Sequence, residues 1–336
     1  MSLECREADV ENVRERLVSF LNAQFDPWGG KEKFDWLYRE NPFGRARAWI
    51  LEDATGRLLG ASSAFPRRLR LGDLRWNGWV LGDFGVSKEH RALGPALALQ
   101  RKVCDTVDQG AVDLWYDFPS RSMMAIHGRM GVRQAGEMVR LVHLLRVDRV
   151  VERKMSDGIL GKSASKAGNA LLEIRNALRK RDPSITVSRY DCDFEESVSP
   201  GIETEGGVSV DRSAAYLNWR HRRDPRGCPT ILRARRAKTD GGFVVFRPGG
   251  EDLEILDAFG IAAEAFFREL VLEVIDIALS RGATRVTASL SDRHPLVAAL
   301  VNLGFSRRDT APFVVYAKPE VLAPETGWFL TSGDRD

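Results

Sequence analysis

Apolar and polar positions along the chain change their period several times, and each change predicts a boundary between structural elements. Alternating apolar residues predict a strand over 79–86, and apolar residues at helical spacing predict a helix over 96–109. A strand that enters a helix through a short turn leaves the first N–H groups of the helix without partners. Because that helix end carries partial positive charge, the turn around Gly94 suits a phosphate, and Gly94 has no Cβ to hold a ligand off.

The same order of elements occurs twice along the chain. Three segments of the first copy match three of the second: 36–44 with 219–227, 81–86 with 256–261, and 130–132 with 303–305. The first copy predicts strands over 48–51, 58–65, 79–86 and 112–118, and helices over 96–109 and 123–130. The second copy predicts strands over 231–234, 243–246, 253–260 and 285–289, and helices over 262–280 and 295–303. Hairpins followed by a β-α-β crossover predict the α/β class, with a mixed, largely antiparallel sheet flanked by helices in each copy.

The repeat also sets the expected domain boundaries in this chain of 336 residues. We expect an N-terminal domain over 1–150, a linker over 151–205, a C-terminal domain over 206–320 and a tail over 321–336. In the linker, Leu171, Ile174 and Leu178 stand at helical spacing and predict a connecting helix that Pro183 ends. Residues 195–208 are rich in Glu, Ser and Gly and predict an exposed loop.

The turn around Gly94 reads Val86-x4-Arg91-x-x-Gly94-x-Ala96, which resembles the acetyl-coenzyme-A loop of the GNAT superfamily of N-acetyltransferases. The resemblance implies two tandem GNAT-like domains and acetyl-coenzyme A, or another acyl-coenzyme A, as co-substrate. The residues that it implies for binding this co-substrate are Phe84, Gly85, Val86, Arg91, Ala92, Leu93, Gly94, Pro95, Ala96, Ser120 and Ser122. An ordinary helix cap is the alternative interpretation of the turn alone.

The two copies depart from this pattern to different degrees. In the first, Ala92 stands where many members of the superfamily carry a second glycine, and Pro95 removes an N–H that would face the pyrophosphate. The second copy has no Arg-x-x-Gly-x-Ala over 259–268, and Phe266 and Phe267 fill the space of the pyrophosphate. We therefore expect a degenerate C-terminal domain that does not bind coenzyme A at this position.

Acyl transfer from a thioester needs a base for the acceptor, a donor for the oxyanion and an acid for the leaving thiolate. The resemblance implies that a backbone N–H around 84–86 holds the thioester carbonyl. It also implies an acid four residues before Gly131, which is His127, whereas the second copy has Leu300 there. Tyr116, on the preceding strand, is a second candidate acid.

Asp83 is the candidate base. It stands in a mostly apolar run beside the expected thioester position, where loss of water raises the pKa of a carboxyl group. Two structural interpretations stay open: Asp83 as a hydrogen-bond partner of a neighbouring loop, and His127 as a surface histidine on an amphipathic helix.

Charge and composition limit which metals, ligands and partners we expect. The four cysteines, Cys5, Cys104, Cys192 and Cys228, are scattered, so we expect neither a metal site nor a disulfide framework. The net charge is +3. Arginines cluster over 220–238, and this segment is either a set of solvated helix and hairpin faces or a binding surface for an anionic acceptor. No nucleic-acid motif supports an RNA or DNA partner. The chain shows no secretory leader and no membrane span, so we expect a cytoplasmic protein, with a homodimer left open.

These observations favour an acyl-coenzyme-A-dependent N- or O-acyltransferase acting on a small molecule, a sugar or a polysaccharide precursor. By analogy, similar tandem proteins modify bacterial cell-surface polysaccharides or small molecules. Aminoacyl transferases of the Fem type also pair two such domains but would not need the loop over 91–96, which argues against them. The alternative is a non-catalytic protein that keeps the fold as an acyl-coenzyme-A-binding module or a scaffold.

Overall fold

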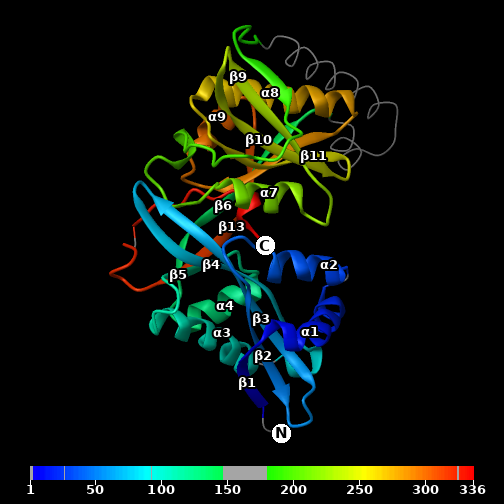
Figure 1. Cartoon of the computed structure of the whole chain (residues 1–336), viewed down its shortest axis with the longest axis vertical. Coiled ribbons are helices and arrows are strands. Elements are labelled where there is room, and N and C mark those ends of the chain that lie inside the picture. Colours follow the sequence, from blue (N-terminus) through cyan, green and yellow to red (C-terminus); the bar gives the residue numbers. More distant parts are fainter. Residues whose placement is uncertain (1–2, 26, 92, 147–179, 324) are drawn as a thin grey trace, which may run out of the picture.

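The computed structural model describes residues 3–25, 27–91, 93–146, 180–323 and 325–336. We call 3–146 the N-terminal half, 180–323 the C-terminal half and 325–336 the C-terminal segment. The halves lie end to end, and the chain terminus lies between them (Figure 1). The described strands form one 13-stranded sheet, in which β1-β2-β3-β4-β5-β13-β6-β12-β11-β10-β9-β7 pair in this order and β8 pairs with β3.

The strands are β1 (Leu3–Ala8), β2 (Arg47–Asp53), β3 (Leu58–Leu71), β4 (Leu74–Val86), β5 (Leu114–Asp117), β6 (Arg133–Leu144), β7 (Thr186–Arg189), β8 (Ser209–Val210), β9 (Thr230–Arg236), β10 (Thr239–Gly249), β11 (Asp252–Phe259), β12 (Arg285–Ser291) and β13 (Ser306–Ala317). Only the β4–β5 and β11–β12 neighbours are parallel among the described pairs, so the sheet is mixed and largely antiparallel. The expected fold class is confirmed.

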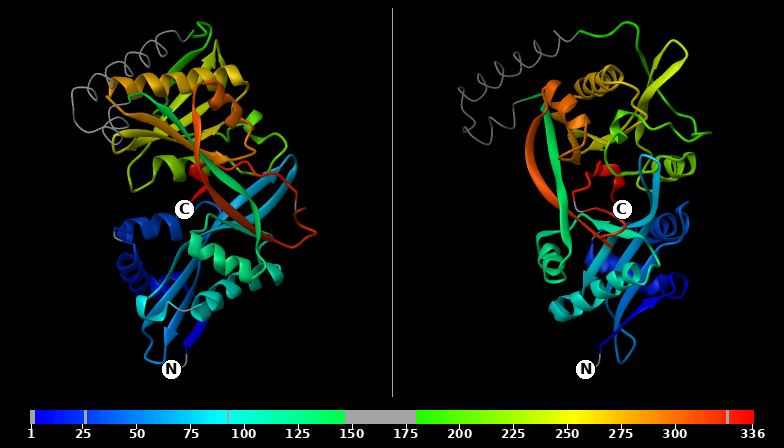
Figure 2. Two further views of the ribbon diagram at one scale, coloured as in Figure 1. Left: turned by 180° about the vertical axis from the view of Figure 1, so that it is seen from behind. Right: turned by 90° about the vertical axis from the view of Figure 1, so that its left-hand side faces the viewer.

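Helices cover both faces of the sheet, as the two views of Figure 2 show. They are α1 (Val10–Gln24), α2 (Gly30–Phe34), α3 (Leu93–Asp108), α4 (Arg121–Arg129), α7 (Ala214–Arg222), α8 (Glu264–Ser280) and α9 (Leu296–Asn302), with short helical turns at Asp35–Arg39, Lys88–His90, Ile202–Thr204 and Ser332–Asp334. In the N-terminal half, α1 packs in one apolar cluster and α3 with α4 in another on the opposite face. In the C-terminal half, α8 and α9 share one cluster, while α7 places Leu217 in another and Tyr216 and Trp219 in the cluster of α1.

The two halves exchange their last strands. Strand β6, which ends the N-terminal half, pairs with β12 over Met138–Leu144, and β13, which ends the C-terminal half, pairs with β5 over Val314–Ala317. The exchanged strands also pair with each other in the middle of the sheet. Each half is therefore completed by a strand of the other, and the boundaries at 150 and 206 stay predictions.

Expected and observed elements agree closely around the turn at Gly94. Strand β4 starts before residue 79, and helix α3 starts at Leu93 rather than at residue 96. The expected connecting helix over 171–181 falls almost wholly outside the described residues. The exposed loop expected over 195–208 is wrong in part, because Glu203 and Val208 are 5% and 0% exposed. No helix of the described residues is long and apolar enough to cross a membrane.

Candidate active site

Strand β4 keeps one edge free where its neighbour ends. On one side it pairs with β3 throughout, with a bulge opposite the Ala61–Ser63 stretch of β3. On the other side it pairs with β5 only over Gly78–Val80. Within the described part of the chain, no strand pairs with the remaining edge over 81–86, which we call the free edge of β4. Unpaired backbone groups of this kind are available to a ligand that lies along the strand.

Asp83 lies in the bulge at the free edge. Its backbone has φ = 48°, a left-handed conformation that non-glycine residues seldom adopt. Its carboxylate, only 8% exposed, accepts hydrogen bonds from Trp28 Nε1 at 2.7 Å and from the Tyr38 hydroxyl at 2.8 Å. Burial raises the pKa of Asp83 to about 6, Asp336 adds to the rise, and Lys33 with the two hydrogen bonds opposes it. Asp83 is thus ionised at neutral pH and basic enough to take a proton.

His127 is fully buried and paired. Helix α4 places its Nε2 at 2.9 Å from a carboxylate oxygen of Asp117, the last residue of β5. Burial raises the pKa of Asp117, and the hydrogen bond to His127 opposes that rise. The other ring nitrogen, Nδ1, has no partner among the described residues. The interpretation of His127 as a surface histidine is therefore wrong.

Tyr116 has a different surrounding from His127. Its ring lies in the apolar cluster of α1, whereas the neighbouring Trp115 lies in that of α3 and α4. Its hydroxyl donates to the backbone oxygen of Asp334 at 3.0 Å, and burial raises its pKa far above the ordinary value. Tyr116 thus ties the C-terminal segment to the sheet, and its role as an acid stays a prediction.

The turn between β4 and α3 is open. Arg91 is exposed, and its Nε lies 3.3 Å from the backbone oxygen of Val86. A Cβ added at Gly94 would meet nothing within 4 Å. Because α3 begins at Leu93, Pro95 stands in the first turn, where its missing N–H would have had no helical partner. Ala92 lies outside the described residues.

The two serines after β5 start α4. Ser120 is the N-cap, and its Oγ accepts from the Met123 N–H at 3.3 Å. The hydroxyls of Ser120 and Ser122 are 2.9 Å apart and exposed. They lie beyond the end of β5, the strand that faces the free edge of β4.

The corresponding turn of the C-terminal half is occupied by its own chain. The Glu203 carboxylate accepts from the N–H groups of Gly260 at 2.8 Å and Ile261 at 3.0 Å. A Cβ at Gly241 would lie 2.0 Å from the ring of Phe266, so that ring fills the space beside the turn. This closure supports the expectation that the C-terminal half binds no coenzyme A here.

The edge of β11 that corresponds to the free edge of β4 is also covered. Strand β11 pairs with β12 only as far as Ile255, and the Ser332 hydroxyl then donates to the backbone oxygens of Ile255 and Leu256 at 3.4 and 3.3 Å. Arg212 fixes the C-terminal segment there through Asp257 at 2.9 Å and Asp334 at 2.8 Å. In the described residues, the C-terminal segment therefore hydrogen-bonds to the edge of β11, whereas the free edge of β4 receives only the Arg91 contact at Val86.

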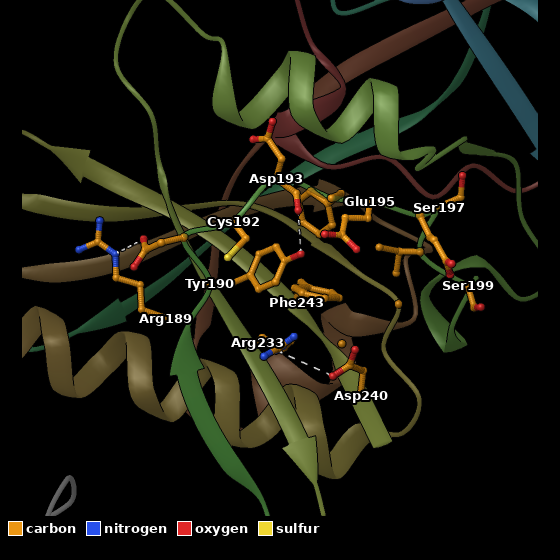
Figure 3. Close-up of a pocket in the computed structure, with 16 residues that line it drawn as sticks. Arg189, Tyr190, Cys192, Asp193, Glu195, Ser197, Ser199, Arg233, Asp240 and Phe243 are labelled. Atoms are coloured by element: carbon orange, nitrogen blue, oxygen red, sulfur yellow. Dashed lines mark hydrogen bonds and ion pairs between the residues drawn. The ribbon is translucent and has the colours of Figure 1, made fainter. Parts of the chain in front are cut away.

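The C-terminal half has a polar cavity of about 620 Å³, which Gly260 of the turn between β11 and α8 also lines (Figure 3). Tyr190 and Phe243 form part of its wall, with ring centroids 5.3 Å apart, and Arg233 lies 3.8 Å from Asp240. None of the predicted site residues lines it. No group of three or more His, Cys, Asp or Glu side chains in the described residues could hold a metal ion.

Sequence reasoning missed several residues that shape the site. Trp28, Tyr38 and Asp336 come from distant segments, so no local pattern marks them. Asp117 could have been predicted as a site residue from the sequence, because a carboxylate at the end of a buried apolar strand stands out in the same way as Asp83 does within one.

Comparisons with known proteins concern the fold of the chain. No protein-family profile matches the sequence, and no curated protein sequence matches it. Among solved structures, the chain is similar to a conserved protein of Enterococcus faecalis described as a probable N-acyltransferase, with a TM-score of 0.65 and 13% identity over 94% of this chain and 72% of that one. It is also similar to a GCN5-related N-acetyltransferase of Anabaena variabilis, with a TM-score of 0.64 and 13% identity over 94% and 73% of the two chains.

A third similar structure is N-myristoyltransferase of Saccharomyces cerevisiae with bound myristoyl-coenzyme A, with a TM-score of 0.60 and 11% identity over 94% of this chain and 82% of that one. At these identities the likeness concerns the fold. The chain has the fold of the GCN5-related N-acetyltransferases, as its turn at Gly94 predicts.

Proposed function

We propose that this protein transfers an acyl group from acetyl-coenzyme A, or another acyl-coenzyme A, to an amine or hydroxyl group of a small molecule or glycan. One contrast carries the proposal. The N-terminal half keeps a free strand edge beside an open turn, and the chain itself covers both in the C-terminal half. The N-terminal half is therefore the proposed catalytic half. We also propose that the protein is cytoplasmic.

The N-terminal half fits an acyl-coenzyme A at two places. The start of α3, with open space at Gly94 and the exposed cation of Arg91, would hold the phosphates. The backbone N–H groups at the end of the free edge, over 84–86, would hold the thioester carbonyl oxygen. A bound acyl-coenzyme A supplies an activated carbonyl carbon and a thiolate leaving group.

The side chains then divide the proton transfers between them. As the acceptor nitrogen or oxygen bonds to the carbonyl carbon and the carbon–sulfur bond breaks, Asp83 takes the acceptor's proton. His127, with a proton on each ring nitrogen, gives the one on Nδ1 to the sulfur and becomes a neutral imidazole, while Asp117 accepts from Nε2–H and orients the ring. Each proton transfer thus has its own group, one on β4 and one on α4.

The second candidate function is a non-catalytic acyl-coenzyme-A-binding protein or scaffold. It is favoured by one observation, which is that the Asp83 carboxylate already accepts two hydrogen bonds in a buried place.

Release of free thiol from acetyl-coenzyme A, measured across amines, sugars and sugar nucleotides, separates the two functions. The proposal predicts acceptor-dependent release that Asp83→Asn slows by about a hundredfold or more. Saturable binding without release for any acceptor would favour the binding protein.

A further inference from the structure

A second polar cavity lies where the C-terminal segment passes between the halves, near the terminus marked C in Figure 1. Its volume is about 180 Å³, and α7, β10, β11 and the C-terminal segment line it. We call it the junction cavity. Four arginines and three carboxylates stand in its wall, and the chemistry proposed above uses none of these arginines.

Two of the arginines are neutralised by neighbours. Arg226 binds Asp224 at 2.7 Å, and Arg247 lies 4.0 Å from Glu254. These pairs fix the wall of the cavity and leave its other two cations for a ligand.

Arg220 is the central unpaired cation of the cavity. It is 6% exposed, so the interpretation of the arginine-rich segment as solvated faces is wrong for this residue. Its Nε and Nη2 donate to the backbone oxygens of Gly333 at 2.9 Å and Arg335 at 2.5 Å. Its Nη1 has no partner among the described residues, and neither has Nε of Arg335. A buried guanidinium with an unused N–H calls for an acceptor, and an anion is the strongest one.

The junction cavity adjoins the proposed base. Asp336 lines the cavity, and its Oδ2 would be 2.1 Å from a Cβ added at Gly82, the residue before Asp83. The charge of Asp336 also raises the pKa of Asp83, which places the two carboxylates within electrostatic reach. The cavity thus has cations without a carboxylate partner at Arg220 and Arg335, and one carboxylate, Asp336, on the side of β4.

We propose that the junction cavity is the acceptor site, and that it takes a small primary amine carrying a carboxylate or a phosphate. This proposal rests on the acyltransferase function above. The anionic group binds Arg220 and Arg335, and the amine nitrogen lies toward Asp336 and Asp83. Its ammonium form first releases one proton to solvent to become the neutral nucleophile, and the second proton passes to Asp83 as the carbon–nitrogen bond forms. An amine without an anionic group would leave Nη1 of Arg220 and Nε of Arg335 without an anionic acceptor.

The test measures kcat and KM for four amines at saturating acetyl-coenzyme A. β-Alanine carries a carboxylate, phosphoethanolamine a phosphate, ethanolamine no charge besides its amine, and putrescine a second amine. The first variant, Arg220→Lys, keeps the positive charge but loses the paired N–H donors of the guanidinium group. The second, Arg335→Gln, lies on the partly exposed C-terminal segment, where a substitution carries a smaller risk of misfolding. Arg281→Gln, exposed at the end of α8, is the control for loss of one positive charge.

We expect an anionic amine to have a KM at least about tenfold below that of ethanolamine, as one charge-assisted hydrogen bond provides. Arg335→Gln and Arg220→Lys should raise that KM about tenfold and leave kcat within about twofold, and Arg281→Gln should change neither. Preference between β-alanine and phosphoethanolamine decides between carboxylate and phosphate.

Equal KM values for ethanolamine and both anionic amines would overturn the acceptor site and leave the acyltransferase function standing. If none of these four amines is acylated, calorimetric titration of the two anionic amines decides what the cavity does, and thiol release across the wider acceptor panel decides the acyltransferase function separately. Binding that Arg335→Gln removes would support an anionic amine site, and absence of binding would overturn it.

Discussion

Trp36 and Trp219, which occupy matching positions of the two repeats, stack on each other with ring centroids 4.9 Å apart. Each indole also donates to the other's backbone oxygen, from Trp36 at 2.9 Å and from Trp219 at 2.8 Å, across 183 residues of chain. The contact joins the two halves around a local two-fold relationship.

The first prediction concerns this pair. Trp36→Phe and Trp219→Phe each remove one indole donor and leave a buried carbonyl without a partner. We expect each to lower the free energy of unfolding by about 1–2 kcal/mol more than Trp328→Phe does. Trp328 is the matched control because it is 1% exposed and its Nε1 has no partner in the described residues. Urea unfolding followed by circular dichroism measures the difference, and equal losses in all three variants would refute the role of the reciprocal bonds.

The exchange of β6 and β13 predicts that neither half folds alone. Separately produced fragments 1–146 and 180–336 should each aggregate or stay unfolded, because each would expose an unpaired strand edge in the middle of the sheet. Produced together, they should associate and regain the circular dichroism spectrum of the whole chain. A monomeric, cooperatively unfolding 1–146 fragment would contradict this prediction.

Sequence patterns predicted the individual helices and strands but not the pairing between distant strands. Period and turn residues place β4, α3 and α4 within a few residues, because each follows from contiguous side chains. They do not reveal that β6 pairs with β12 or β13 with β5, since register between distant strands leaves no local signal.

The candidate site follows the same rule. Asp83 and Gly94 are found from their own neighbours, one in an apolar run and the other in a turn. The partners that give Asp83 its chemistry, Trp28 and Tyr38, lie 55 and 45 residues away in sequence. The closing of the C-terminal copy by Glu203 was likewise out of reach, because that residue lies in a segment that reads as solvated loop.

The pairing of His127 with Asp117 predicts a separable effect on turnover. His127→Gln should lower kcat by at least about a hundredfold, as expected for a lost general acid, with acetyl-coenzyme A affinity within about threefold of wild type. Asp117→Asn should give a smaller loss, because it changes only the group that orients the ring. Stopped-flow detection of the released thiol measures both, and unchanged turnover in His127→Gln would remove this residue from the mechanism.

The raised pKa of Asp83 predicts the pH dependence of catalysis. Asp83 must be ionised to accept a proton, so it should give the pH profile of kcat/KM a limb that rises with pH and levels off above about 6, separate from the rise due to deprotonation of an amine acceptor at higher pH. Asp83→Asn should remove this limb and slow turnover by about a hundredfold or more.

Stability should change in the opposite direction. Because the pKa of folded Asp83 lies above its ordinary value of 3.8, folding favours the protonated carboxyl, and stability falls as pH rises from 3.8 to about 6. The neutral Asp83→Asn variant should therefore unfold at a temperature no lower than wild type at pH 8. Thermal unfolding at pH 5 and 8 checks this, and an Asp83→Asn variant that unfolds at a lower temperature than wild type at pH 8 would contradict this prediction.

The central claim is that the start of α3, and not its counterpart in the C-terminal half, holds the acyl-coenzyme A. Calorimetric titration of acetyl-coenzyme A into wild type, Gly94→Glu and Gly249→Glu tests it most directly. Both glycines have open space at the Cβ position, and Gly249 lies in β10 of the C-terminal half, so the second variant controls for added bulk and charge. We predict one site per chain with a dissociation constant on the order of micromolar, lost in Gly94→Glu and kept in Gly249→Glu. Equal binding by all three proteins would place the co-substrate elsewhere and contradict the account.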